Sequence, residues 1–181
     1  MLRIHAGLYK GRNLKTVRNP DVRPTTAKVK LSFFDILQEE IRDTVFLDGF
    51  GGTGNVGLEA LSRGAAYVVF IDQLEETIRV LQENINRIGI PREHYRIIRG
   101  DYNRSVIQLS REGLSFDIIF LDPPYDLLRV ANPLKVVYKR GILRPEGRIV
   151  LERPTDLRFD ARYFRRTRIQ HLGRKSLDFY A

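Results

Sequence analysis

Hydrophobic positions follow two alternating spacings along most of this chain. Between residues 44 and 151, apolar runs of four to six residues alternate with longer segments whose apolar residues recur every three or four positions. The short runs indicate strands buried on both faces, and the longer segments indicate amphipathic helices. Such alternation is typical of a doubly wound, mostly parallel sheet with helices on both faces. We therefore expect an α/β fold.

The pattern predicts seven strands. Five lie in the central region, at Thr44–Leu47, Tyr67–Ile71, Tyr95–Arg99, Phe116–Leu121 and Arg148–Leu151. A terminal hairpin adds Arg165–Gln170 and Lys175–Tyr180. A short helix is expected from Val56, and a longer one has apolar residues at helical spacing as far as Ile88. The longer helix is expected to end at Gly89, because glycine readily adopts the left-handed conformation that closes a helix.

Residues 1–43 precede this alternation and are expected to form a small extension of the sheet. Leu2–Gly7 and Arg12–Thr16 flank Tyr9-Lys10-Gly11, which predicts a basic hairpin. A helix is expected after Thr26, whose hydroxyl can cap the first turn. The extension is too small to fold alone, so we expect the 181 residues to form one domain.

Charge is distributed unevenly along the chain. Residues 1–30 carry +7, residues 31–138 carry −5 and residues 139–181 carry +7, which sum to the net charge of +9. Basic ends around a mildly acidic middle are typical of a catalytic body that meets a polyanion, although general solubility is an alternative. The chain has no cysteine, which excludes disulfides, thiolate zinc sites and cysteine nucleophiles. No apolar run reaches membrane-spanning length and no signal-peptide pattern begins the chain, so we expect a cytoplasmic protein without a membrane partner.

Asp122-Pro123-Pro124-Tyr125 directly follows the apolar run Phe116–Leu121. Because two prolines disfavour both a strand and a helix start, we expect a stiff loop at the carboxyl end of a central strand. Open α/β sheets bind their ligands at this edge. A carboxylate, proline carbonyls and an aromatic ring together suit chemistry on a flat, amino-bearing group. The alternatives are that Asp122 caps a turn and that Tyr125 anchors the loop.

A glycine-rich segment, which includes Phe50, follows the first predicted strand. Its residues Gly52, Gly54 and Gly57 match the spacing of a dinucleotide-binding loop, which is a weak signal on its own. The glycines allow a ligand to approach the backbone closely. The loop therefore indicates a nucleotide-like ligand, with a nicotinamide dinucleotide and S-adenosylmethionine as the two candidates.

Acidic residues at the ends of three successive predicted strands favour the second candidate. Asp48 would repel a pyrophosphate but suits the ammonium group of S-adenosylmethionine. Asp72 can accept hydrogen bonds from both ribose hydroxyls, and Asp101, next to Tyr102, can accept one from the adenine amino group. The alternatives are a helix cap for Asp48 and a turn residue for Asp101. We therefore expect S-adenosylmethionine as the cofactor, bound by Phe50, the loop glycines, the three carboxylates and Tyr102.

Seven segments together resemble the RsmD-type methyltransferases. They are Ala6–Arg12, Arg23–Thr26, Asp48–Gly54, Gly57–Ala65, Phe70–Asp72, Gly100–Asp101 and Phe120–Tyr125. The resemblance covers nearly the whole chain. It implies a Rossmann-like class I fold, S-adenosylmethionine as methyl donor, and the N2 of a guanine in bacterial small-subunit ribosomal RNA as acceptor. It also implies that Lys10, Arg12, Arg23 and Thr25 bind the RNA, although a solvated basic face is the alternative.

The resemblance and the residue chemistry predict one mechanism. Asp122 and the backbone carbonyl of Pro123 can each accept one N–H of the exocyclic amine, which directs the nitrogen lone pair toward the methyl group. Tyr125 is expected to stack on a base flipped out of its helix. The mechanism needs no metal. The usual family residues at Gly49 and Gly51 are bulkier, which predicts a looser loop in this chain.

Two other functions remain open at this point. The first is methylation of adenine N6 in DNA or another RNA, and the second is a catalytically silent, RNA-binding factor for ribosome assembly. For the preferred function we expect ribosomal RNA as the partner, either naked or in a partly assembled small subunit. We also expect the protein to act as a monomer.

Overall fold

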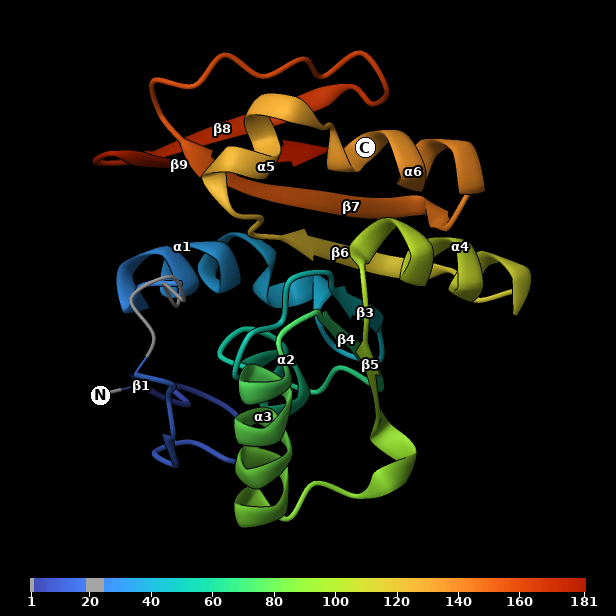
Figure 1. Ribbon diagram of the computed structural model, residues 1–181. Coiled ribbons are helices and arrows are strands. Elements are labelled where there is room, and N and C mark those ends of the chain that lie inside the picture. The colour runs from blue at the N-terminus through green and yellow to red at the C-terminus, as the bar shows by residue number, and fades with distance from the viewer. Residues whose placement is uncertain (1, 19–24) are drawn as a thin grey trace.

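Nine strands form two sheets in residues 2–18 and 25–181, the part of the chain that a computed structural model describes. Arg23 lies outside these residues. The small sheet pairs β1 (Leu2–Arg3) with β2 (Asn13–Leu14). The large sheet contains β3 (Val45–Asp48), β4 (Tyr67–Asp72), β5 (Tyr95–Arg99), β6 (Phe116–Leu121), β7 (Leu143–Pro154), β8 (Arg166–Leu172) and β9 (Lys175–Tyr180). Its order is β5-β4-β3-β6-β7-β9-β8, parallel except for the pairs made by β9, so the predicted seven-stranded, mostly parallel sheet is confirmed (Figure 1).

Six α-helices connect the strands of the described chain. They are α1 (Ala27–Leu37), α2 (Gly57–Ser62), α3 (Glu75–Ile88), α4 (Tyr102–Arg111), α5 (Tyr125–Val130) and α6 (Pro133–Arg140), with short 3-10 turns at Gln38–Glu40 and Arg92–His94. The Thr26 hydroxyl caps α1 as predicted, because it accepts the N–H of Val29 at 3.4 Å. Gly89 ends α3 with a φ of 83°, also as predicted. The sequence pattern did not reveal α4, α5 or α6.

The core consists of two hydrophobic clusters, one on each face of the large sheet. Alternate residues of a strand point to opposite faces, so Phe46 of β3 packs with α1, α2 and α3, while Leu47 packs with α4, α5 and α6. Phe120 and Leu121 of β6 divide in the same way. Helices therefore cover both faces (Figure 1). This two-sided burial explains why the strands are continuous apolar runs in the sequence.

A buried charge cluster holds the N-terminal extension to the sheet. The side chain of Glu59, in α2, has no exposed area, and it accepts the backbone N–H groups of His5 at 2.9 Å and Ala6 at 3.0 Å. Its oxygens also lie 3.1 Å from the Nζ of Lys30 and 2.9 Å from the Nε of Arg63. Ile4 is fully buried in the same hydrophobic cluster as α1 and α2. The extension therefore shares its core with the sheet.

β7 is longer than predicted. The apolar run predicted a strand at Arg148–Leu151, whereas β7 spans Leu143–Pro154. Its first residue pairs with Phe116 of β6, and its last pairs with the first residue of β9. The additional residues are mostly polar, so hydrophobicity alone does not identify them as strand.

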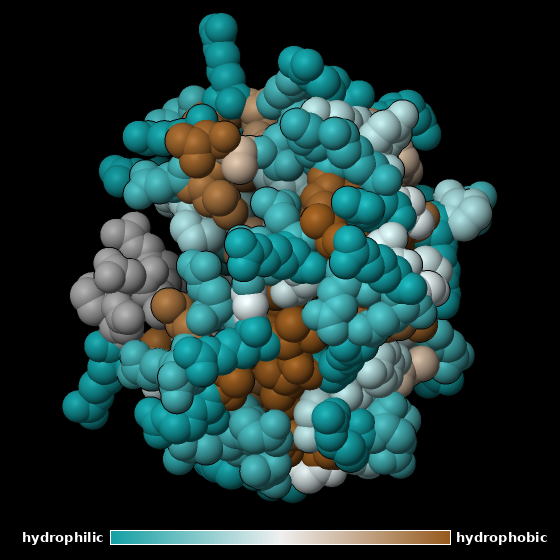
Figure 2. Space-filling view, turned by 45° about the vertical axis from the view of Figure 1, so that its right-hand side comes forward, coloured by the Kyte–Doolittle hydropathy of each residue, from teal (hydrophilic) through white to brown (hydrophobic). Residues whose placement is uncertain are grey.

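The surface of the described chain is mainly hydrophilic. On the face that Figure 2 shows, apolar side chains appear as separate patches among hydrophilic ones. The most exposed large apolar side chains are Leu8 and Val130, which lie on different segments. Single exposed apolar residues of this kind are ordinary for a folded protein. None of the described helices has the length and apolar character needed to cross a membrane.

Candidate active site

The strand order reverses between β3 and β6, which are neighbours in the sheet. From β3 the chain continues to β4 on one side, and from β6 it continues to β7 on the other. Open α/β sheets bind ligands at the carboxyl ends of the strands beside such a reversal. Asp48 is the last residue of β3, and Asp122 directly follows β6. The N–H of Gly49 donates to the carbonyl of Phe120 at 3.0 Å, so the two segments meet as the sequence predicted.

The glycine loop is held against β4 by Asp72. One carboxylate oxygen of Asp72 accepts the N–H of Gly52 at 2.9 Å, and the other accepts the N–H of Leu74 and the hydroxyl of Thr77. Gly52 has a φ of 52°, and a Cβ there would meet no atom within 4 Å. The loop is therefore fixed in place but open at Gly52, where a ligand can approach the backbone.

The looser loop expected at Gly49 and Gly51 is wrong. A Cβ at Gly49 would lie 2.6 Å from the Cδ2 of Leu121 and 3.0 Å from the ring of Tyr102. At Gly51 it would lie 3.3 Å from the ring of Phe70. Neighbouring side chains fill the space beside both glycines, so the loop is tightly packed.

Asp48 is buried beneath this loop. Its side chain is only 2% exposed, and its Oδ2 accepts the N–H of Gly57 at 2.9 Å, which is the helix-cap alternative. Burial raises the pKa of Asp48 to about 7, and the nearby charge of Asp72 contributes in the same direction. Its contact with a ligand ammonium stays a prediction.

The third carboxylate is exposed, and the tyrosine beside it belongs to the core. Asp101 caps α4, because its Oδ1 accepts the N–H of Arg104 at 3.0 Å. The hydroxyl of Tyr102 donates to the buried carbonyl of Pro133 at 3.1 Å. The ring of Tyr102 stacks on Phe50, with 4.8 Å between the centroids and 26° between the planes. Tyr102 therefore supports Phe50, which is the more accessible of the two rings.

Asp122 is partly buried and linked to the N-terminal extension. The hydroxyl of Thr25 donates to its Oδ2 at 2.9 Å, and the carbonyl of Thr25 accepts the side-chain N–H of Asn55 at 2.7 Å. Hydrogen bonds thus join the extension, the glycine loop and Asp122. Burial and the charge of Glu152 raise the pKa of Asp122 well above its ordinary range, against the opposing effects of Lys175 and Thr25.

The expectation that Asp122–Tyr125 forms a loop without a helix start is wrong. Pro124 is the residue before α5, and Tyr125 is the first residue of that helix. The N–H groups of a first helical turn have no partner within the helix, so proline is well tolerated at such a start. Tyr125 is therefore partly buried on a rigid helical turn. Among the described residues, none donates a hydrogen bond to the carbonyl of buried Pro123.

The residues expected to bind RNA do not all meet at Asp122. Thr25 does, but Lys10 and Arg12 are exposed at the turn of the N-terminal hairpin. The N–H of Leu8 donates to the carbonyl of Ser62 at 2.8 Å, which places this turn at the end of α2 that points away from the glycine loop. Their contact with RNA stays a prediction, as does that of Arg23.

Two further cations serve for comparison with this hairpin. Arg111 and Arg140, called the distal pair below, are exposed at the last residues of α4 and α6. The hydrogen bond between Tyr102 and Pro133 joins the first residues of those two helices, at the opposite end. In residues 2–18 and 25–181, no group of three or more histidine or acidic side chains is arranged to hold a metal ion.

Sequence reasoning missed Glu152 and Lys175. Glu152 has no exposed area and forms an ion pair with Lys175 from β9. The signal was present in the sequence, because Glu152 directly follows the apolar run Arg148–Leu151, just as Asp48 and Asp122 follow theirs. An acidic residue directly after a buried apolar run is therefore found at this site once more, although β7 itself continues to Pro154.

A glycine loop packed against Asp-Pro-Pro-Tyr at the strand reversal of this seven-stranded sheet is the architecture of a class I methyltransferase. The family described as "Conserved hypothetical protein 95" matches residues 2–181. This protein belongs to that family, which confirms the resemblance to the RsmD-type enzymes.

Relatives of known name agree with this assignment. Ribosomal RNA small subunit methyltransferase D of Haemophilus influenzae is 31% identical over 158 residues, which cover 86% of this chain and 80% of the relative. The solved structure of hypothetical protein TTHA0928 from Thermus thermophilus has a TM-score of 0.85 at 28% identity and covers 99% of this chain and 98% of its own. A SAM-dependent methyltransferase from Agrobacterium tumefaciens has a TM-score of 0.59 at 26% identity and covers 70% of this chain and 45% of its own.

Proposed function

We propose that this protein transfers a methyl group from S-adenosylmethionine to the exocyclic N2 of a guanine in small-subunit ribosomal RNA. One observation carries the proposal: Asp122 and the Pro123 carbonyl lie beside the glycine loop at the strand reversal. The name of the Haemophilus influenzae relative supports ribosomal RNA as the substrate, and that of the Agrobacterium tumefaciens neighbour supports the methyl donor.

The acidic and aromatic side chains around the glycine loop fit a cationic ligand without phosphates. Asp72 and Asp101 would accept hydrogen bonds from ribose and adenine, and Phe50, which stacks on Tyr102, would pack against the adenine. Asp48 would face the ammonium group, whose positive charge would favour the ionised carboxylate. When bound, S-adenosylmethionine supplies an electrophilic methyl group attached to a positively charged sulfur.

Asp122 and Pro123 prepare the amine for attack. The lone pair of an exocyclic amine is delocalised into the base, which makes the nitrogen a poor nucleophile. Asp122 and the Pro123 carbonyl each accept one N–H, localise the lone pair toward the methyl group and stabilise the positive charge that develops on nitrogen. The Thr25 hydroxyl holds the Oδ2 of Asp122, which leaves Oδ1 for the amine.

The base reaches this position by leaving its stack. Flipping costs a few kcal/mol, and stacking on Tyr125 recovers about 1–3 kcal/mol. Phosphate contacts with Lys10, Arg12 and Arg23 contribute the rest and anchor the RNA beside the extension. The protein acts as a monomer on the RNA, because one chain supplies both the donor loop and the acceptor corner.

Methyl transfer from labelled S-adenosylmethionine to purified small-subunit RNA tests the proposal. Digestion of the RNA to nucleosides is expected to place the label in N2-methylguanosine, and duplex DNA is expected to remain unlabelled. Label in N6-methyladenosine would instead identify an adenine methyltransferase. Binding of RNA without transfer, to naked RNA and to small subunits alike, would identify a silent assembly factor.

A further inference from the structure

A buried carboxylate that this mechanism does not use lies beside Asp122. Leu121, the last residue of β6, pairs with Leu151 of β7, so the residues that follow them, Asp122 and Glu152, lie side by side. One oxygen of Glu152, Oε1, pairs with the Nζ of Lys175. The other oxygen, Oε2, is buried and has no hydrogen-bond partner among the described residues. A fully buried acid therefore has one unused oxygen next to the proposed catalytic carboxylate.

Three charged groups share this small volume, and their charges do not balance when both acids are ionised. A buried carboxylate oxygen without a partner is costly, and two neighbouring carboxylates repel each other. Lys175 neutralises only one of them. Burial lowers the pKa of Lys175, but Glu152 and Asp122 outweigh this effect and keep the ammonium charged. The phenol of Tyr125 also lies near Lys175.

One proton shared by the two acids resolves both problems. It would sit between Asp122 and the Oε2 of Glu152, so that one negative charge remains to face Lys175. The pKa of Asp122 is raised well above its ordinary range by burial and then by Glu152, which agrees with a proton held at this position. The Thr25 hydroxyl donates to the Oδ2 of Asp122 and keeps the carboxyl oriented.

We propose that Asp122 and Glu152 form a one-proton carboxyl pair, balanced by Lys175, which takes up the proton that the amine loses on methylation. The proposal rests on the amine methylation described above. The nitrogen lone pair forms the new N–C bond, the electrons of the C–S bond stay on the sulfur, and one N–H proton moves to Asp122 and is shared with Glu152. Before transfer the pair has lost its proton and, with Lys175, carries one net negative charge opposite the sulfonium. After transfer both sides are neutral.

The proposal predicts that S-adenosylmethionine and its product, S-adenosylhomocysteine, release different numbers of protons when they bind. A sulfonium near Asp122 favours the ionised pair, so the protein releases a proton when the donor binds. S-adenosylhomocysteine has a neutral sulfur and leaves the pair protonated. Glu152 is thus a positioning residue that sets the protonation of Asp122.

Isothermal titration calorimetry tests this without RNA. The two probes, S-adenosylmethionine and S-adenosylhomocysteine, are titrated at pH 7 in buffers of different ionisation enthalpy, which reveals the protons released. The wild-type protein is expected to release up to about one more proton per site with the methionine compound. Glu152→Gln is expected to abolish this difference. Equal release by both ligands in the wild type, or an undiminished difference in the variant, would overturn the proposal.

A second variant and a second readout guard against simple misfolding. Because Glu152→Gln leaves Lys175 without its ion-pair partner, the double variant Glu152→Gln/Lys175→Met is measured in parallel and is expected to lose the difference as well. In single-turnover transfer, the rise of the rate with pH is expected to shift to lower pH by about one unit or more in Glu152→Gln. An unchanged midpoint would indicate a merely structural role. Glu112→Gln, which removes a surface carboxylate, is the control and is expected to change neither readout.

The two proposals can fail separately. The calorimetry involves no acceptor, so a missing difference in proton release rejects the carboxyl pair whatever the protein methylates. A retained difference together with label in a nucleoside other than N2-methylguanosine rejects the guanine acceptor alone.

Discussion

Replacement of Glu59 by Gln is expected to loosen the N-terminal extension from the sheet. Glu59 accepts the backbone N–H groups of His5 and Ala6 and faces the side chains of Lys30 and Arg63, and all of these contacts are buried or nearly so. Burial raises the pKa of Glu59, but the hydrogen bond from His5 and the charge of Lys30 outweigh it, so that the pKa is lowered. The carboxylate is therefore ionised in the folded protein and stabilises it.

The size of the effect follows from the burial of this cluster. Gln keeps the shape of the side chain but removes its charge and turns one acceptor into a donor. Removal of one partner from a buried ion pair costs about 3–5 kcal/mol of unfolding free energy. In a chain of this length each kcal/mol lowers the Tm by roughly 2–4 °C, so we expect Glu59→Gln to melt roughly 6–20 °C below the wild type.

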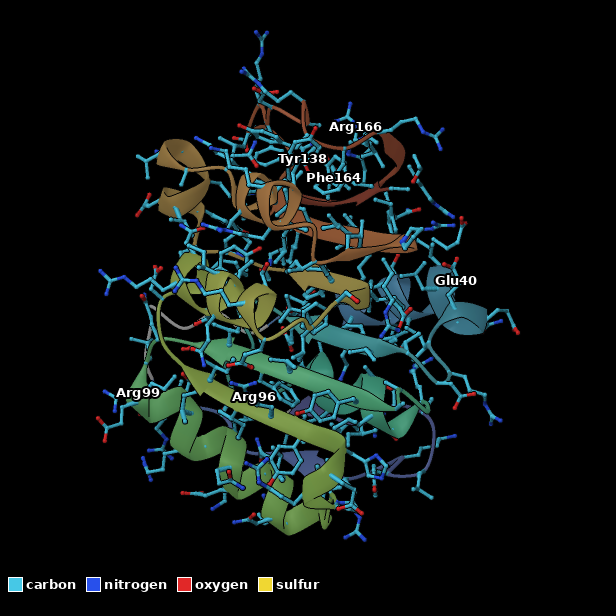
Figure 3. All side chains as sticks on the ribbon, turned by 90° about the vertical axis from the view of Figure 1, so that its right-hand side faces the viewer. Glu40, Arg96, Arg99, Tyr138, Phe164 and Arg166 are labelled. Atoms are coloured by element: carbon cyan, nitrogen blue, oxygen red, sulfur yellow. The ribbon has the colours of Figure 1, made fainter. Side chains whose placement is uncertain are left out.

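Thermal unfolding followed by circular dichroism, without ligands, measures this difference. The control is Glu112→Gln, which breaks the ion pair between Glu112 and Arg96. Arg96 lies on β5 at the edge of the sheet, where Figure 3 labels it, and its side chain is partly exposed. Because exposed pairs of this kind contribute little, the control is expected to melt close to the wild type. Equal shifts of the Tm in the two variants would refute the reasoning.

Three further predictions concern the site and its surroundings. The pKa of Asp48 is raised to about 7, so its contribution to stability is present at acid pH and lost as the pH rises through 7. Urea unfolding without ligand gives the free energy of unfolding of Asp48→Asn and of the wild type. The value for the variant minus that for the wild type is expected to rise by roughly 2–3 kcal/mol from pH 5 to pH 8, and a constant difference would contradict this. The double variant Lys10→Ala/Arg12→Ala is expected to weaken RNA binding and to reduce the slope of log K against log salt concentration by roughly 1–2. Alanine at both positions of the distal pair is expected to leave this slope unaltered. Equal slopes for the two double variants would exclude the hairpin from the interface. Tyr125→Phe keeps a stacking ring and is expected to retain near-normal KM for RNA, whereas Tyr125→Leu raises it roughly 5- to 100-fold, and equal values for the two would argue against stacking.

Much of the sheet is visible in the sequence because its strands are buried on both faces. β6 is apolar at nearly every position, and β3 and β4 are similar, so that their limits were predicted within one residue. α3 was equally clear, since its exposed face is strongly charged and Gly89 closes it. The limits of these elements can therefore be predicted from the local sequence alone.

Other elements depend on contacts that one-dimensional patterns do not contain. α5 and α6 are six and eight residues long and are separated only by Ala131 and Asn132, so neither is long enough for apolar residues to recur over several turns. The polar start of β7 becomes strand because β6 offers a partner. Tyr102 was expected at the ligand because it adjoins Asp101, but its place in the core follows from stacking on Phe50.

The candidate site was predictable where chemistry and strand ends coincide. Asp48, Asp72 and Asp122 were identified by this rule, and Glu152 similarly follows an apolar run, although its strand continues to Pro154. The partners of these groups were not predictable, because they come from distant segments. The bond from Thr25 to Asp122 spans 97 positions, and only the folded chain reveals it.

The central claim is that the charge of Asp122 polarises the amine, and Asp122→Asn tests it most directly. Asn retains an oxygen for the Thr25 hydroxyl, so the local hydrogen bond is preserved while the negative charge is lost. In single-turnover transfer to small-subunit RNA at saturating S-adenosylmethionine, we expect the rate to fall about 10²- to 10³-fold while the affinity for RNA stays near that of the wild type. A variant that transfers methyl groups within about threefold of the wild-type rate would contradict the account, because the charge would then contribute almost nothing to the barrier.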